Sequence, residues 1–289
     1  MNNYAKELRR LLAENKFLTL PGVYDCLSAR IAQEAGFPAL FLSGGALAYS
    51  VLGKPDFGFL NLAEFGDAIQ HIVSACRAPL LADADNGFGN AIQAANTGAV
   101  YEQLGAAGLQ IDDKVLPASH PARNEIVDWE MIGPKIQAVR DSVSDDFVIV
   151  YRTCANLYGY GVEESIRRIN LARERGADYA YVDGIKSMEE LKRISDEAAI
   201  PLMVNLNEKG FVGGNVPIEE VKALRYSIGL FPISSMLAAA QGMIEVMGAL
   251  ADRGSTLSVR DKMTDPPTRI HNMMGQTALV EKYAPYYTL

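Results

Sequence analysis

Short apolar segments recur along the chain, and each is followed by a stretch with helical periodicity. There are eight such segments, at residues 17–25, 39–44, 79–85, 108–113, 147–153, 179–184, 201–206 and 227–234. Intervening stretches such as VEESIRRINLARERG place apolar residues at i, i+3, i+4 and i+7, as one face of a helix does. Strands that alternate with helices pair in parallel through right-handed crossovers. The pattern predicts an α/β fold, a parallel eight-stranded (β/α)₈ TIM barrel, and a doubly wound open sheet is the alternative.

Glycines precede several of the apolar segments. Gly36, Gly108 and Gly176 each stand where a predicted helix gives way to a strand, and glycine there supplies the left-handed residue that ends a helix. No composition shift or linker divides the chain, so residues 1–289 are expected to form a single barrel domain. A C-terminal helical extension is predicted from about residue 235, and its aromatic end, YAPYYTL, is expected to pack on a neighbouring subunit.

Composition argues against several classes of partner. The 289 residues are 49% hydrophobic and 21% charged, as in a globular protein, and carry a net charge of −8, which disfavours nucleic acid and anionic membranes. No apolar run approaches the roughly 18 residues of a membrane span, and the first residues resemble an amphipathic helix rather than a signal peptide. Three cysteines without zinc spacing indicate reduced thiols. We therefore expect a cytoplasmic protein that binds neither nucleic acid nor membrane.

Polar residues end nearly every apolar segment, and always at its C-terminal end. They are Tyr24, Asp25, Ser43, Gly44, Gly45, Asp83, Asp85, Asp112, Asp113, Arg152, Asp183, Asn205, Asn207, Glu208 and Ser234. In a (β/α)₈ barrel these ends converge on one mouth, where active sites lie. A purely structural role would scatter such residues over both ends of the barrel. The bias therefore predicts an active site at the mouth.

The segment LLADADNGFGN predicts a metal site. Asp83 and Asp85 are two residues apart on a strand and so face the same side, and two carboxylates held together need a cation or a proton between them. Asp112 or Asp113 on the next strand can join them. Oxygen ligands without nearby Cys or His suit Mg²⁺, or Mn²⁺, better than Zn²⁺. The alternative is that Asp85 starts a turn and that the aspartates cap a helix near Asn90.

Other candidates are individually less specific. Arg152 ends the apolar run FVIVYR, and a buried arginine needs an anion, either a substrate carboxylate or an acidic residue of the same mouth. Lys114 follows the Asp pair and either reaches the site or lies on the surface. His120, in a long polar loop, is a catalytic candidate or a solvated histidine.

Backbone donors are also predicted at the mouth. Ser43, Gly44 and Gly45 can bring N–H groups close to an oxyanion because glycine has no Cβ.

At these residues the chain resembles the isocitrate lyase/phosphoenolpyruvate mutase superfamily, over roughly residues 8–250. The resemblance rests on PGVYDCLSARIAQEAGFPALFLSGG, LGKPDFG, LLADADNGFGN, IDDK, YRT followed by GVEESIRRINLARERGAD, and NLNE. It implies a (β/α)₈ barrel that often exchanges its last helix between subunits of a dimer or tetramer, so a homo-oligomer is expected.

The resemblance also implies roles for single residues. Asp85 would hold Mg²⁺, with Asp83 and Asp112 acting directly or through water; Asp112 stands where relatives usually have Glu. Arg152 would clamp the substrate carboxylate. Ser43, Gly44 and Gly45 would bind the carboxylate and the developing enolate oxygen. Asp56 would lie over the site. The far wall would be lined by Asp183, Asn205 and Glu208. Ser234 is a further substrate-binding candidate, and Tyr24, Lys114 and His120 are catalytic candidates.

One loop departs from both branches of the superfamily. The carbon–carbon lyases carry KKCGH, whose Cys is the general acid/base, and the phosphonomutases carry Lys-x-Asn-Ser after EDK; here the sequence reads DDK and then LPASHPARNE. That His120 takes the place of the missing Cys as general acid is a hypothesis.

We predict a Mg²⁺-dependent carbon–carbon lyase or decarboxylase that acts on a small 2-oxo or 2-hydroxy di- or tricarboxylate through an enolate. The alternatives are a phosphonate enzyme and a non-catalytic barrel that binds a carboxylic acid.

Overall fold

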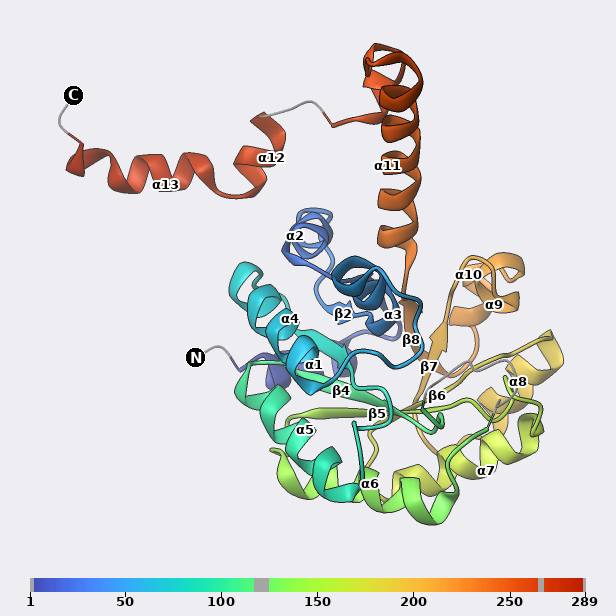
Figure 1. The fold of residues 1–289 in the computed structure, drawn as a ribbon. Helices are drawn as coiled ribbons and strands as arrows, with labels where there is room; N and C mark the ends of the chain where they lie inside the picture. The colour runs from blue at the N-terminus through green and yellow to red at the C-terminus, as the bar shows by residue number, and fades with distance from the viewer. Residues whose placement is uncertain (1–2, 117–124, 265–267, 288–289) are drawn as a thin grey trace.

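The predicted barrel is confirmed. A computed structural model describes residues 3–116, 125–264 and 268–287, and its eight strands pair in parallel, in chain order, into a closed barrel (Figure 1). The strands are β1 (Leu18–Val23), β2 (Leu40–Leu42), β3 (Leu80–Asp83), β4 (Gly108–Asp112), β5 (Val148–Thr153), β6 (Tyr179–Val182), β7 (Leu202–Asn205) and β8 (Tyr226–Phe231). Each falls within, or within one residue of, a predicted segment, and closure between β8 and β1 excludes the open sheet.

Helices surround this barrel. Those that precede or connect the strands are α1 (Tyr4–Glu14), α2 (Cys26–Glu34), α3 (Gly44–Leu47), α4 (Leu62–Ala75), α5 (Ala91–Gln103), α6 (Trp129–Ser142), α7 (Gly161–Glu174), α8 (Met188–Glu197), α9 (Phe211–Asn215) and α10 (Ile218–Lys222). A π-helical turn, Ala48–Leu52, follows α3. Beyond β8 come α11 (Ser234–Arg253), α12 (Thr268–Met273) and α13 (Gln276–Tyr283), with short 3₁₀ segments at Leu257–Lys262 and Ala284–Tyr286.

The alternation of side chains along each strand produces two apolar layers. Leu81 and Val150 point into the barrel, where they meet Leu8 and Leu12 of α1, which closes the N-terminal end. Their neighbours in the strands, such as Leu80, pack outward against the helices. A residue at the C-terminal end of a strand therefore faces either the mouth or the helix layer, according to its place in this two-residue period.

One predicted helix end is wrong. Gly36 and Gly176 have φ of 88° and 92°, the left-handed conformation expected there. Gly108 instead opens β4, where a Cβ would lie 2.3 Å from the carbonyl oxygen of Val148. The left-handed residue after α5 is Gly105, with φ of 93°. Gly108 is thus required for close strand packing, and Gly105 ends the helix.

The last helices leave the barrel. Helix α11 stands away from the other helices of the barrel (Figure 1), although α12 beyond it contacts α2. None of the residues of α11 is buried. By length and composition alone α11 could cross a membrane, with a mean hydropathy of 1.2. This differs from our expectation that no run approaches that length, but one such helix is weak evidence because helices of soluble proteins pass the same test.

Candidate active site

A polar pocket of about 200 Å³ opens at the C-terminal ends of the strands. It is lined by Phe41, Ser43, Gly45, Tyr49, Asp56, Asp83, Gln110, Arg152, Tyr181, Asn205, Asn207, Leu230, Pro232 and Ile233. Seven of these are residues predicted at the mouth or over it: Ser43, Gly45, Asp56, Asp83, Arg152, Asn205 and Asn207. Pockets for drug-sized ligands measure roughly 300–1,000 Å³, so this one suits a small molecule.

Asp83 and Asp85 are both buried beside this pocket. The Ala84–Gly87 turn places Asp85 at φ 43°, a left-handed conformation that is uncommon for aspartate and that clusters at functional sites. Burial raises the pKa of Asp83, and burial together with the nearby Asp83 charge raises that of Asp85 well above its usual range. The alternative to a metal site was that Asp85 starts a turn and that the aspartates cap the next helix. The turn is present, but the side chain that caps α5 is that of Asn90 rather than that of an aspartate.

Lys114 reaches the site rather than the surface. It is 6% exposed, and its Nζ lies 2.8 Å from Oδ2 of Asp112 and 4.0 Å from Oδ1 of Asp85. Burial opposes the charged form of Lys114, but attraction to Asp112, together with smaller contributions from Cys154 and Asp85, outweighs it and holds the pKa of the ammonium well above its usual range. Lys114 therefore supplies a permanent positive charge among the carboxylates.

The donor set at this mouth fits a hard divalent cation. Oδ2 of Asp112 is buried with the Lys114 ammonium as its ion-pair partner, whereas Oε1 of Gln110 is buried with no hydrogen bond among the described residues. Buried polar atoms are normally satisfied. Across the described ranges, no three His, Cys, Asp or Glu side chains are arranged to hold a metal by themselves. Mg²⁺ usually takes only one or two protein carboxylates and keeps several waters, so this geometry is compatible with it.

Arg152 is paired within the mouth. Its Nη2 donates to Oδ2 of Asp183, and its guanidinium lies 5.2 Å from the ring centre of Tyr181. The Tyr181 hydroxyl and the Gly184 N–H donate to Oδ1 of Asp183, at 3.0 and 2.9 Å. Burial would raise the pKa of Asp183, but Arg152 outweighs burial and lowers it. Of the two anions that the sequence allowed for Arg152, the acidic residue of the same mouth is present, as Asp183. Arg152 nevertheless lines the pocket as well.

The glycines after β2 allow carboxylates to approach the backbone. A Cβ on Gly44 would lie 2.9 Å from Oδ2 of Asp83, and one on Gly45 would lie 3.1 Å from Oδ2 of Asp56. Ser43 caps α3, its hydroxyl accepting from the Ala46 N–H at 3.4 Å. The first N–H groups of a helix have no acceptor within it, so donors lie at this edge of the mouth.

A second pocket, of about 280 Å³, adjoins the far wall. Asp183 lines it, and Asn205 and Asn207 line both pockets. Glu208 and Ser234 pair with each other through the Ser234 hydroxyl and line neither of these pockets. Asn205 is thus the far-wall residue that both pockets share.

Tyr24, a predicted catalytic residue, is not part of this arrangement. Tyr24 lines a separate pocket of about 300 Å³, with Leu47 of α3, Ile72 of α4 and others. His120 lies outside the described residues. Sequence reasoning also missed Gln110, which lines the mouth; its place two residues before Asp112 on the same strand face could have revealed it.

The fold and the mouth together define a (β/α)₈ barrel with a small, charged pocket at the catalytic end. Residues 8–247 match the phosphoenolpyruvate phosphomutase family. The chain belongs to this family, within the phosphoenolpyruvate mutase/isocitrate lyase superfamily, as the motifs indicated.

Individual relatives cover nearly the whole chain. The 2,3-dimethylmalate lyase of Eubacterium barkeri is 33% identical over 99% of both chains. The structure of oxaloacetate acetylhydrolase with 3,3-difluorooxalacetate is 31% identical, with a TM-score of 0.88, over 98% of this chain and 97% of that one. Phosphonopyruvate hydrolase with oxalate and Mg²⁺ is 25% identical, with a TM-score of 0.87, over 98% and 99%. These relatives include enzymes of both carbon–carbon and phosphonate chemistry.

Proposed function

We propose that the protein is a Mg²⁺-dependent carbon–carbon lyase, in the broad sense that includes decarboxylation, for a small 2-oxo or 2-hydroxy di- or tricarboxylate. The observation that carries the proposal is that Asp85 and Asp112 lie around Lys114, with Asp83 and Arg152 on the adjoining pocket. In this arrangement the aspartates would hold a cation and Arg152 would bind a carboxylate of the substrate. The similarity to 2,3-dimethylmalate lyase and oxaloacetate acetylhydrolase supports it.

Each group has a defined task in this proposal. Asp85 would hold Mg²⁺, or Mn²⁺ in its place, with Asp83 and Asp112 acting directly or through water. The chemistry that such a cation supplies is Lewis-acid stabilisation of the negative charge that develops on the substrate oxygen. Arg152 would bind a substrate carboxylate with the donors that Asp183 leaves free. The N–H groups of Gly44 and Gly45 would face the developing enolate oxygen.

Lys114 has two effects in this scheme. Its ammonium offsets the repulsion among buried carboxylates, and because its pKa is high it holds a proton at Nζ throughout the neutral range. The group that protonates the carbon product is not assigned by the described residues, and His120 stays a hypothesis for that role.

A cytoplasmic homo-oligomer completes the proposal. Helix α11 exposes Met243, Ile244 and Met247 at 57%, 67% and 60%, and exposed apolar patches of this kind mark interfaces. A second copy of the chain is the expected cover, in a dimer or tetramer.

The test is a Mg²⁺-dependent turnover assay on oxaloacetate, 2-methylisocitrate, 2,3-dimethylmalate and phosphonopyruvate, with pyruvate, oxalate and phosphate detected. We expect a carbon product that disappears in Asp85→Ala and persists in Asp141→Asn, which changes an exposed aspartate of α6. Loss of one ligand should weaken Mg²⁺ binding about 100-fold or more, because even second-sphere partners are worth 10- to 100-fold.

The other outcomes separate the alternatives. Phosphate release from phosphonopyruvate would move the protein to the phosphonate branch, which Lys114 and the similarity to phosphonopyruvate hydrolase favour. Mg²⁺ binding without turnover of any member of the panel would support a non-catalytic barrel.

A further inference from the structure

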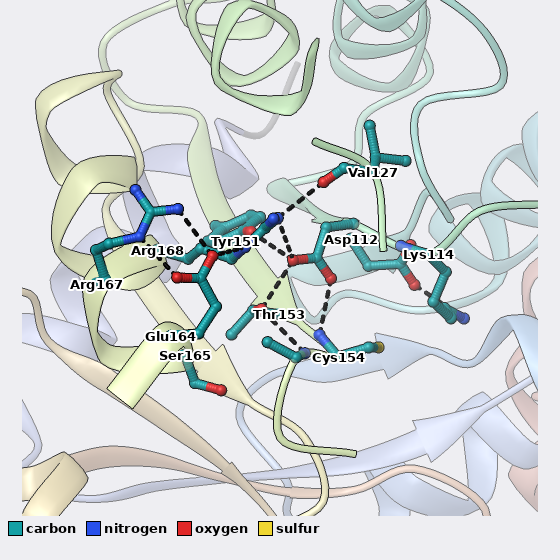
Figure 2. A network of polar contacts seen from close by, with 12 residues as sticks. Asp112, Lys114, Val127, Tyr151, Thr153, Cys154, Glu164, Ser165, Arg167 and Arg168 are labelled. Carbon is teal, nitrogen blue, oxygen red and sulfur yellow. Dashed lines mark hydrogen bonds and ion pairs between the residues drawn. The ribbon is translucent and has the colours of Figure 1, made fainter. Parts of the chain in front are cut away.

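A second polar cluster lies behind the mouth, on the opposite face of β4. Asp113 is fully buried there and accepts hydrogen bonds from the Tyr151 hydroxyl, the Thr153 hydroxyl and the Cys154 N–H, each at 2.8 Å. Nη1 of Arg168 donates to the same carboxylate at 3.1 Å. Figure 2 shows how Tyr151 and Thr153 of β5, Cys154 directly after that strand and Arg168 of α7 converge. None of these five residues lines the mouth pocket.

Arg168 connects three separate parts of the chain. Although it lies on α7, only 5% of it is exposed. Its Nη1 also donates to the Val127 carbonyl at 2.8 Å, and its Nε donates to Glu164 at 2.7 Å (Figure 2). The Val127 N–H in turn donates to the Asp113 carbonyl at 2.7 Å. Arg168 therefore fixes the end of β4 to the segment that returns at Val127.

The cluster is joined covalently to the mouth. Asp113 stands between Asp112 and Lys114, and the Lys114 N–H donates to Oδ1 of Asp112 at 3.1 Å. Lys114 also forms an antiparallel bridge with Ile126, next to Val127. Any shift in the backbone of Asp113 would consequently move both members of the Asp112–Lys114 ion pair.

The charge of Arg168 is needed at this position. A buried carboxylate is costly unless it is paired and hydrogen-bonded, and removal of its partner leaves an uncompensated charge. The three neutral donors around Asp113 are already directed at it, so loss of the guanidinium would leave no other cation in contact with this carboxylate among the described residues. Relaxation of Asp113 towards solvent would then pull on β4.

We propose that Arg168 is a positioning residue that sets the geometry of the Asp112–Lys114 ion pair from the helix layer. The assignment rests on the proposed function, because it takes that pair to be part of the catalytic mouth. A misplacement of about 1 Å can lower turnover by about 100-fold. Substrate affinity, which depends on Arg152 and the pocket walls, should change much less.

The chain contains a matched control. Arg167 precedes Arg168 and also pairs with Glu164, at 2.7 Å, but it is not in contact with Asp113. We expect Arg168→Met to lower kcat about 10- to 100-fold with KM within about threefold, and Arg167→Met to stay within about twofold of the natural protein. Arg168→Lys should recover part of kcat because it restores the charge without the planar fork.

A milder variant covers the case in which Arg168→Met does not fold. Tyr151→Phe removes a single hydrogen bond to Asp113 and keeps the ion pair, so a several-fold fall in kcat at unchanged KM is expected. Equal kcat values in Arg168→Met and Arg167→Met, or a loss confined to KM, would overturn the proposal.

A structural measurement separates this proposal from the proposed function. If the natural protein turns over no substrate of the panel, the proposed function fails. The positioning role is then decided by crystal structures of the Arg168→Met and Arg167→Met variants. A changed separation between Oδ2 of Asp112 and Nζ of Lys114, 2.8 Å here, in the first variant alone supports it, and an unchanged separation overturns it.

Discussion

Asp112 and Asp113 are neighbours in the chain, yet their carboxylates lie on opposite faces of β4. Asp112 faces the mouth, where its Oδ2 lies 2.8 Å from Nζ of Lys114. Asp113 faces the helix layer, where its Oδ2 lies 3.1 Å from Nη1 of Arg168. Each carboxylate thus has its own cation, one in the candidate active site and one behind it. This division of a single Asp-Asp pair underlies both the proposed chemistry and the proposed role of Arg168.

Substitution of Gly44 should disturb the metal site without loss of the fold. In Gly44→Ala the new Cβ would meet Oδ2 of Asp83 at 2.9 Å and Cζ of Phe65 at 3.0 Å, and overpacking of this kind costs about 1–3 kcal/mol. We expect weaker Mg²⁺ binding by calorimetry and a lower thermal midpoint. Gly242→Ala, on α11 with no atom within 4 Å of the new Cβ, is the control. Unchanged Mg²⁺ affinity in Gly44→Ala would show that Asp83 does not contribute to the site.

Arg152 should affect stability and substrate binding by separable routes. Arg152→Met leaves the Asp183 charge buried and unpaired, which should cost about 3–5 kcal/mol of unfolding free energy. A second change, Asp183→Asn, removes that charge and should restore much of the stability measured in urea. KM for the carboxylate substrate should stay high in both variants. Recovery of KM in the double variant would mean that Arg152 does not bind substrate.

The ion pairs of Glu164 should make part of the protein's folding stability sensitive to acid. The guanidinium of Arg167, and then that of Arg168, outweigh burial and lower the pKa of Glu164 to about 2, from an ordinary value of 4.5. The folded protein therefore binds fewer protons at this site than the unfolded chain, so its stabilisation is present above pH 4.5 and is lost as pH falls towards 2.

Urea unfolding at pH 6 and at pH 3 tests this direction. Glu164→Gln should be less stable than the natural protein at pH 6, and the difference should shrink at pH 3. Glu174→Gln, at an exposed residue at the end of the same helix, serves as the reference. A difference that grows on acidification would contradict the assignment.

Helix α11 should govern assembly. The natural chain, of 31.4 kDa, should sediment as a dimer or tetramer because α11 leaves Met243 and Met247 exposed. The double variant Met243→Asp, Met247→Asp should place charges in the interface and shift the sedimenting mass towards that of the monomer. Asp252→Asn, also on α11, provides the comparison. Sedimentation of the natural protein as a monomer at micromolar concentration would refute the proposed oligomer.

Much of the fold was predictable because its signals are local. The eight apolar segments, the amphipathic stretches between them and the polar residues at their ends are all readable along the chain, and a parallel barrel needs little else to bring Asp83, Asp112 and Arg152 to one mouth. Gly108 was misassigned for the opposite reason, since the contact that requires a glycine there comes from Val148, 40 residues away.

By itself the sequence determined the barrel, its charged mouth and the family. Only the tertiary structure decided that Asp113 turns to the helix layer and pairs with Arg168, that Lys114 is buried between carboxylates, that Arg152 pairs with Asp183, and that Tyr24 lines another pocket. The physical reason is that a two-residue period says which side chains share a face but not which face is inside. That choice depends on the register of neighbouring strands and on what the helix layer offers, such as Arg168, 55 residues beyond Asp113.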